Sequence, residues 1–133
     1  MTIYIPLAFW LCVCACFDWK HREVPNVLTL PVMIFMAWLR LTGHTHGSSL
    51  AAWGIVALVF LGFLSNVGIG GADFKISAAL ALLDPQLAVW AWAGAMLWYL
   101  ALRAVTLGHE RPYKLPGVVG FAFGIILFTL RIH

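Results

Sequence analysis

Two aspartates lie next to long apolar stretches and are the residues of this chain best suited to chemistry. Asp18 stands in the sequence FDWK, and Asp73 stands in the sequence GGADFK. A charged side chain inside a membrane costs roughly 2.5 to 3.5 kcal/mol, so such acids usually line a cavity or take part in a reaction. If the two carboxylates meet on one side of a membrane, one can act as base and the other as acid to activate a water molecule.

The composition indicates that these aspartates belong to a membrane protein. Apolar residues make up 63% of the 133 residues and charged residues only 10%, which a water-exposed surface would not tolerate. Six apolar runs cover residues 3–17, 27–39, 50–67, 76–83, 87–102 and 115–130. Most are shorter than the roughly 20 residues of a complete span, so flanking polar and aromatic residues must complete them. We therefore predict an all-α, polytopic integral membrane protein of about six transmembrane helices, with a short fourth helix, in one membrane-embedded domain over residues 1–133.

The basic residues predict how these helices are oriented. The first run lacks a basic leader and a cleavage site, so we expect a retained helix, and six helices then put both termini on one side. Most basic residues fall on the face that carries Asp18 and Asp73, which the positive-inside rule makes cytoplasmic. These are Lys20, Arg22, Lys75, Arg103, Arg111 and Lys114, whereas Arg40 and Arg131 fall on the other face. The pI near 9.0 thus reflects topology, because no basic stripe with accessible aromatics predicts nucleic-acid binding.

The opposite face carries polar residues that we exclude from the reaction. His44 and His46 lie in a glycine-flanked loop on that face. A metal site there needs more ligands than the loop offers, so we expect a solvated turn. Asp84 precedes a proline in a turn on the same face, so it is not a member of the catalytic pair.

The segments around the two aspartates each have a simple structural interpretation when taken alone. Pro25 stops the first helical run, and Asn26 is suited to N-cap the next helix, which leaves Asp18 as an acid at a helix end. The glycines before Asp73 allow close backbone approach, or form a turn in which Asp73 caps the fourth helix. A nucleotide-binding loop is excluded because the third glycine of that motif is missing and no Gly-Lys-Ser/Thr follows.

Taken together, these stretches resemble the type IV prepilin peptidases, the GxGD-type membrane aspartic proteases of bacteria and archaea. Six residues separate Asp18 from the pair Pro25 and Asn26, and a basic-Pro-x-x-x-Pro segment at 111–116 precedes a glycine-containing last helix. The resemblance spans the whole chain and implies that Asp18 and Asp73 are the catalytic pair. The GxGD-like motif that opens the fourth helix consists of Gly70, Gly71, Ala72, Asp73, Phe74 and Lys75.

Two departures from the larger family members bear on activity. The family motif has glycine immediately before its aspartate, where this chain has Ala72. The added methyl group should be tolerated unless position 72 requires a positive φ or touches the substrate backbone. Larger members also carry a cytoplasmic insert with paired CxxC motifs, which resembles a zinc site, and an N-methyltransferase activity. The connection after Asp18 is too short for that insert, so the chain resembles the short, peptidase-only members.

The small residues of the helices predict packing rather than a metal or cofactor site. The three cysteines, Cys12, Cys14 and Cys16, stand at alternate positions of the first helix. They cannot all face one metal ion from a regular helix, so we interpret them as small apolar packing residues. Gly120 and Gly124 form a small-xxx-small pair in the last helix, which is typical of close helix packing.

The resemblance implies a membrane aspartic endopeptidase that cleaves the short basic leader from prepilin or pseudopilin precursors at the cytoplasmic face of a prokaryotic inner membrane. The two carboxylates would share a proton and titrate as a coupled pair, and the sequence leaves open which is acid and which is base. Lys75 could favour an ionised carboxylate, bind an acidic group of the substrate, or anchor the fourth helix at the interface. The expected partners are the precursor and membrane lipid, without a cofactor, and the oligomeric state stays open.

Two other functions are compatible with the same residues. A non-enzymatic membrane protein, such as a proton-coupled carrier or a pilus or secretion assembly subunit, would use the aspartates as relay or structural groups. A carrier needs polar groups at mid-membrane, whereas the helix centres here are almost wholly apolar. Ala72 motivates the other alternative, an inactive relative of the peptidases. Co-expression with a prepilin, followed by a test for loss of its leader, separates these functions.

Overall fold

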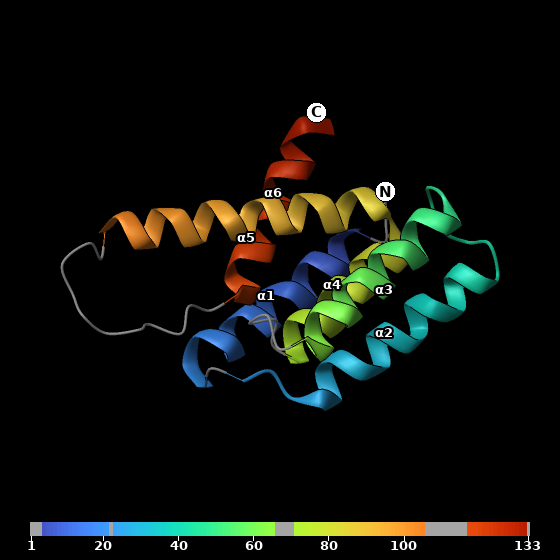
Figure 1. Cartoon of the computed structure of the whole chain (residues 1–133), viewed down its shortest axis with the longest axis horizontal. Coiled ribbons are helices and arrows are strands. Elements are labelled where there is room, and N and C mark those ends of the chain that lie inside the picture. The colour runs from blue at the N-terminus through green and yellow to red at the C-terminus, as the bar shows by residue number, and fades with distance from the viewer. Residues whose placement is uncertain (1–3, 22, 66–70, 106–116, 133) are drawn as a thin grey trace. The chain divides into compact units, whose positions relative to one another are not determined.

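The computed structural model describes residues 4–21, 23–65, 71–105 and 117–132, and these ranges form six α-helices (Figure 1). The fourth helix is the shortest, with 13 residues. The all-helical prediction, with six helices and a short fourth one, is therefore confirmed. The helices are α1 (Tyr4–His21), α2 (Asn26–Leu41), α3 (Ser49–Leu64), α4 (Gly71–Leu83), α5 (Pro85–Val105) and α6 (Gly117–Ile132).

Two helices extend beyond their apolar runs, and both extensions matter for the aspartates. The first apolar run ends at Phe17, whereas α1 continues to His21. The fourth apolar run begins at Ile76, whereas α4 already begins at Gly71, within the motif that was expected to open it. An apolar run marks only the part of a helix that is buried or in lipid, whereas backbone hydrogen bonding continues through polar residues. As a result, both aspartates lie inside helices.

The surface of the helices is strongly apolar. Only α5 among the described helices is both long and apolar enough to cross a membrane, while α2, α3 and α6 are apolar but shorter. Large apolar side chains are nevertheless exposed along these helices, including Leu50 (86% exposed) and Leu58 (71%) on α3. Six membrane spans therefore stay a prediction, although the exposed side chains are of the kind that lipid covers.

The chain separates into two compact units, and the first contains α1, most of α5 and α6. In this unit α1 packs on α6, and α6 crosses α5 (Figure 1). The crossing is close because glycines line it: a Cβ on Gly94 would overlap the Cα of Gly124. Beside it, Trp92 of α5 meets Phe121 of α6 edge-on, with ring centroids 5.2 Å apart. The predicted packing role of Gly120 and Gly124 is thus confirmed.

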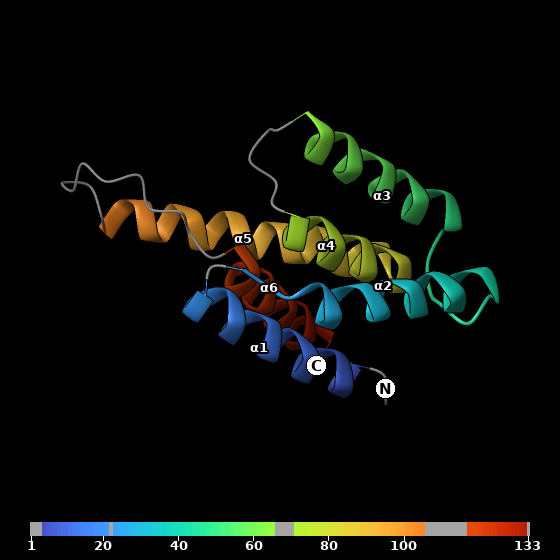
Figure 2. The ribbon, with the colours of Figure 1, turned by 90° about the horizontal axis from the view of Figure 1, so that it is seen from below.

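The second unit contains α2, α3 and α4, with α4 packed against both of the others (Figure 2). Every residue of α4 from Ile76 to Leu83 is buried. The sequence ISAALALL is apolar on all sides of a helix, which is the pattern of a helix with neighbours all round. The short fourth run is therefore the core of this unit.

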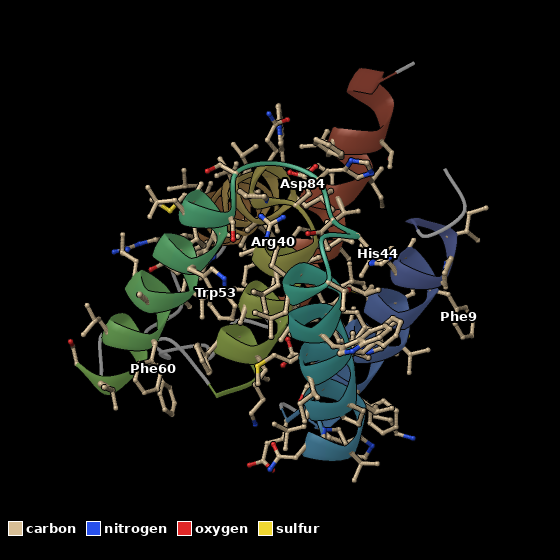
Figure 3. The ribbon with its side chains drawn as sticks, turned by 90° about the vertical axis from the view of Figure 1, so that its right-hand side faces the viewer. Phe9, Arg40, His44, Trp53, Phe60 and Asp84 are labelled. Atoms are coloured by element: carbon tan, nitrogen blue, oxygen red, sulfur yellow. The ribbon has the colours of Figure 1, made fainter. Side chains whose placement is uncertain are left out.

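A buried arginine organises the loop between α2 and α3. Arg40 is only 7% exposed, and its guanidinium donates hydrogen bonds to Thr45 Oγ1 (2.6 Å) and to the carbonyl oxygens of His46 (2.8 Å) and Ser48 (2.9 Å). Gly47 in this loop has φ 78°, in the left-handed region that favours glycine. His44 (Figure 3) and His46 lie on this loop, as predicted.

Asp73 and Asp84 lie at opposite ends of α4 in the second unit. A Cβ on Gly47 would lie 2.9 Å from Pro85 Cδ, so the loop after α2 lies beside the end of α4. At this end Asp84 Oδ1 accepts a hydrogen bond from the Gln86 backbone N–H (2.9 Å) and caps α5 (Figure 3). Asp73 lies 11 residues earlier, roughly 16 Å away along the helix axis. Asp84 is therefore a helix cap at the far end of α4 from Asp73, and its exclusion from the catalytic pair stays a prediction.

Candidate active site

Asp18 is positioned by a helix that lies far from it in sequence. It lies in the last turns of α1 and is 9% exposed. Its Oδ2 atom accepts a hydrogen bond from the backbone N–H of Val118, at 3.1 Å. Val118 is in the first turn of α6, where backbone N–H groups have no partner within their own helix. Asp18 therefore caps α6 across 100 residues of sequence, within the first unit.

This capping bond has an electrostatic consequence. The N-terminus of a helix carries a partial positive charge of about half an elementary charge, which favours a nearby carboxylate in its negative form. The bond also fixes one carboxylate oxygen at a buried position. Sequence reasoning missed Val118, although the Pro-Gly dipeptide at the start of the last apolar run marks a helix start, and helix starts attract carboxylates.

Asp73 also stands at a helix N-terminus, but within its own helix. It is the third residue of α4, in the first turn, and is partly buried. Asp73 stands within the first turn rather than before the helix, because α4 begins two residues earlier, at Gly71. A carboxylate in the first turn is stabilised by the same helix dipole. Both candidate aspartates are thus placed at the positive end of a helix.

Ala72 is compatible with the conformation of this helix start. It lies inside α4, where the backbone has the negative φ that any residue adopts. Positive φ occurs at Gly43 and Gly47, both in the loop after α2. Among the described residues, a Cβ added to the neighbouring Gly71 would touch only the ring of Phe63, at an ordinary 3.8 Å. The methyl group at position 72 therefore needs no unusual backbone.

An aromatic cluster holds the same turn of α4 against α3. The ring of Phe74 lies 5.5 Å from that of Phe60 and 5.8 Å from that of Phe63, between centroids. Pairs of this kind contribute about 0.5–1.5 kcal/mol beyond the area they bury. Phe74, the residue after Asp73, thus holds one side of α4 against α3.

The Pro25–Asn26 pair is connected to the motif of α4 through Asn26. Asn26 was predicted to N-cap α2, and this is wrong: Pro25 occupies that position, with φ −59° and ψ 139°, and Asn26 is the first helical residue. The Pro25 carbonyl accepts the Leu28 N–H at 3.0 Å. Asn26 Oδ1 instead accepts a hydrogen bond from Lys75 Nζ.

The predicted site residues are divided between the two units. Asp18 belongs to the first, and Asp73 belongs to the second together with Pro25, Asn26, Gly71, Ala72 and Lys75. Because the two carboxylates belong to separate units, their pairing stays a prediction. Gly70 and the segment 111–116 lie outside the described residues.

The cysteines lie on different sides of α1. Cys14 is fully buried, while Cys12 and Cys16 are exposed, so the packing role expected for all three applies to Cys14 alone. In the part of the chain that the structure describes, no three His, Cys, Asp or Glu side chains gather as they would around a metal ion.

One comparison with known proteins identifies a family. The model of the type IV leader peptidase family matches residues 5–130, a range that includes both aspartates and all three motifs. No curated protein and no solved structure matches the chain at a significant level.

Proposed function

Because the chain belongs to the type IV leader peptidase family, we propose that it is a membrane aspartic endopeptidase that removes the short basic leader from prepilin or pseudopilin precursors. One observation carries the proposal. Each of the two motif aspartates stands at the N-terminus of a helix, Asp18 through its bond to Val118 and Asp73 in the first turn of α4. A helix dipole favours the charged form of a carboxylate, and this is the form in which one member of the pair accepts a proton from water.

The reaction uses the two carboxylates and one water molecule. One carboxylate accepts a proton from the water, and the resulting hydroxide attacks the carbonyl carbon of the scissile peptide bond. The other, protonated, donates its proton to the carbonyl oxygen. Collapse of the tetrahedral intermediate breaks the C–N bond, and a proton passes to the leaving nitrogen, giving a carboxylic acid and an amine. Asp18 and Asp73 share these roles, and the reaction needs no cofactor.

We further propose that all six helices span the inner membrane, with the aspartates at the cytoplasmic face. The exposed apolar side chains of α3 and the length of α5 support this arrangement. Within the second unit, Asp73 lies at one end of α4 and Asp84 at the other, which fits opposite sides of a membrane. A basic leader in the cytoplasm would then reach Asp73, while the hydrophobic helix of the precursor stays in lipid.

The test is co-expression with a prepilin whose leader ends in glycine, with cleavage followed by the shift in its mass. Asp18→Asn and Asp73→Asn should each abolish cleavage, because the amide supplies neither base nor acid. In Asp18→Asn the side-chain amide oxygen can still accept the Val118 N–H, so the fold should be retained and the protein should reach the membrane in normal amounts.

Asp84→Asn is the matched control. Asparagine caps helices as well as aspartate does, and Asp84 lies at the far end of α4, so this variant should cleave normally. Substantial cleavage by either of the first two variants, or loss of cleavage in the control alone, contradicts the assignment.

A further inference from the structure

Lys75 connects two motifs that are far apart in the sequence. Its ammonium group donates a hydrogen bond to Asn26 Oδ1, and the two residues are 49 positions apart. Lys75 belongs to the first turns of α4, and Asn26 is the first residue of α2. The bond therefore joins the start of α4 to the start of α2, within the second unit.

Asn26 is available for this bond because of the residue before it. Pro25 occupies the position that precedes α2, and its carbonyl accepts the Leu28 N–H. An asparagine at that position would use its side chain to cap its own helix. Because Asn26 stands one residue later, its side-chain oxygen accepts a hydrogen bond from the Lys75 ammonium instead.

Successive residues of α4 face different neighbours. Each residue of an α-helix is rotated by about 100° from the one before it. Lys75 is bound by α2, and Phe74 packs on Phe60 and Phe63 of α3. Asp73 is about 200° from Lys75, and residues two apart do not face each other. The side chains of Lys75 and Asp73 therefore leave the backbone of α4 in different directions.

We propose that Lys75 and Asn26 form a positioning pair that fixes the rotation of α4 about its axis and so aims Asp73 at the reaction. This inference rests on the proposed peptidase function. Lys75 acts here through Asn26 rather than on the substrate. A rotation of about 15° would move a carboxylate that lies about 6 Å from the axis by roughly 1.5 Å. A misplacement of about 1 Å costs on the order of 100-fold in rate.

The experiment uses the full-length protein in liposomes and a pilin-like precursor with a basic leader that ends in glycine. Lys75→Met and Asn26→Ala should each lower kcat by about 10- to 100-fold and leave KM nearly unchanged. The double variant should be no slower than the slower single variant, because either change alone breaks the pair. Lys75→Arg keeps a donor and should retain most activity.

Lys20→Met is the matched control for loss of a positive charge. Lys20 stands two residues after Asp18, as Lys75 stands two residues after Asp73, but Lys20 is exposed at the end of α1. Its replacement should leave kcat within about twofold of the wild type, because it removes the same charge without breaking the α2–α4 bond. An equal loss in this control would mean that surface charge, not the pair, is responsible.

Three other results would overturn the inference. A raised KM in Lys75→Met with normal Asn26→Ala would mean that Lys75 binds the substrate directly. Losses that multiply in the double variant would mean that the residues act independently.

If a single variant does not accumulate, the coupling is measured by thermal unfolding of Lys75→Gln, Asn26→Ser and their combination, and additive shifts count against the pair. A wild type that cleaves no precursor removes the proposed function itself.

Discussion

The close crossing of α5 and α6 gives a quantitative test of the fold. Gly124 of α6 lies against α5, and a Cβ at this position would overlap the carbonyl oxygen of Trp90 and lie 2.7 Å from Ala91 Cα. Both are backbone atoms, which cannot rotate away as a flexible side chain can. Gly124→Ala must therefore push the two helices apart.

The size of the effect follows from two opposing contributions. Overpacking a well-filled site costs about 1–3 kcal/mol, and contact with rigid backbone puts this site at the upper end. Alanine returns about 1 kcal/mol because it favours helix more than glycine does. The net loss expected for Gly124→Ala is therefore about 2 kcal/mol in the free energy of unfolding.

A second glycine separates the two contributions. Gly54 lies in the interior of α3, and no atom of the described residues lies within 4 Å of a Cβ built on it. Gly54→Ala should therefore keep only the gain in helix propensity and stabilise the protein by up to about 1 kcal/mol. Unfolding by increasing SDS in mixed micelles, followed by tryptophan fluorescence, measures both variants. If Gly124→Ala were as stable as the wild type, or if the two variants shifted together, the close crossing of α5 and α6 would be refuted.

Three further changes test other parts of the structure. Arg40→Met should destabilise the protein by about 1–3 kcal/mol, measured by the same unfolding assay, because it leaves two carbonyls and a hydroxyl of the loop without their donor. Ala72→Gly should keep leader cleavage and lose up to about 1 kcal/mol of stability from helix propensity; cleavage that appeared only in this variant would support the inactive-relative alternative. Cys14→Ser should lower the free energy of unfolding by about 1–3 kcal/mol because it buries a hydroxyl, whereas Cys12→Ser, at an exposed site, should lower it less. Leader cleavage by both variants should survive thiol reagents and chelators.

The sequence allowed the number of helices and the location of the candidate residues to be predicted. Apolar runs long enough to form helices are a local property, and the all-round apolar sequence of α4 indicates a surrounded helix. Hydropathy alone does not mark the helix ends, because Asp18 and Asp73 lie in polar extensions of α1 and α4, and it was the motifs that predicted Asp18 at the end of the first helix and Asp73 at the start of the fourth. The role of Asn26 was also misjudged, because helix-capping preferences describe a residue in its own segment and not its neighbours in space.

What the sequence determined by itself was the helical architecture, the family and the two aspartates that carry its motif. These follow from residue types and short spacings. Only the tertiary structure decided which distant groups the motif residues contact. Asp18 accepts a hydrogen bond from the Val118 N–H, and Lys75, two residues after Asp73, donates one to Asn26. Such contacts join residues 100 and 49 positions apart, and they form because helix starts and side-chain amides offer hydrogen-bonding groups that their own helices do not use. Local sequence specifies that those groups exist, but the packing of α1 on α6 and of α2 on α4 selects their partners.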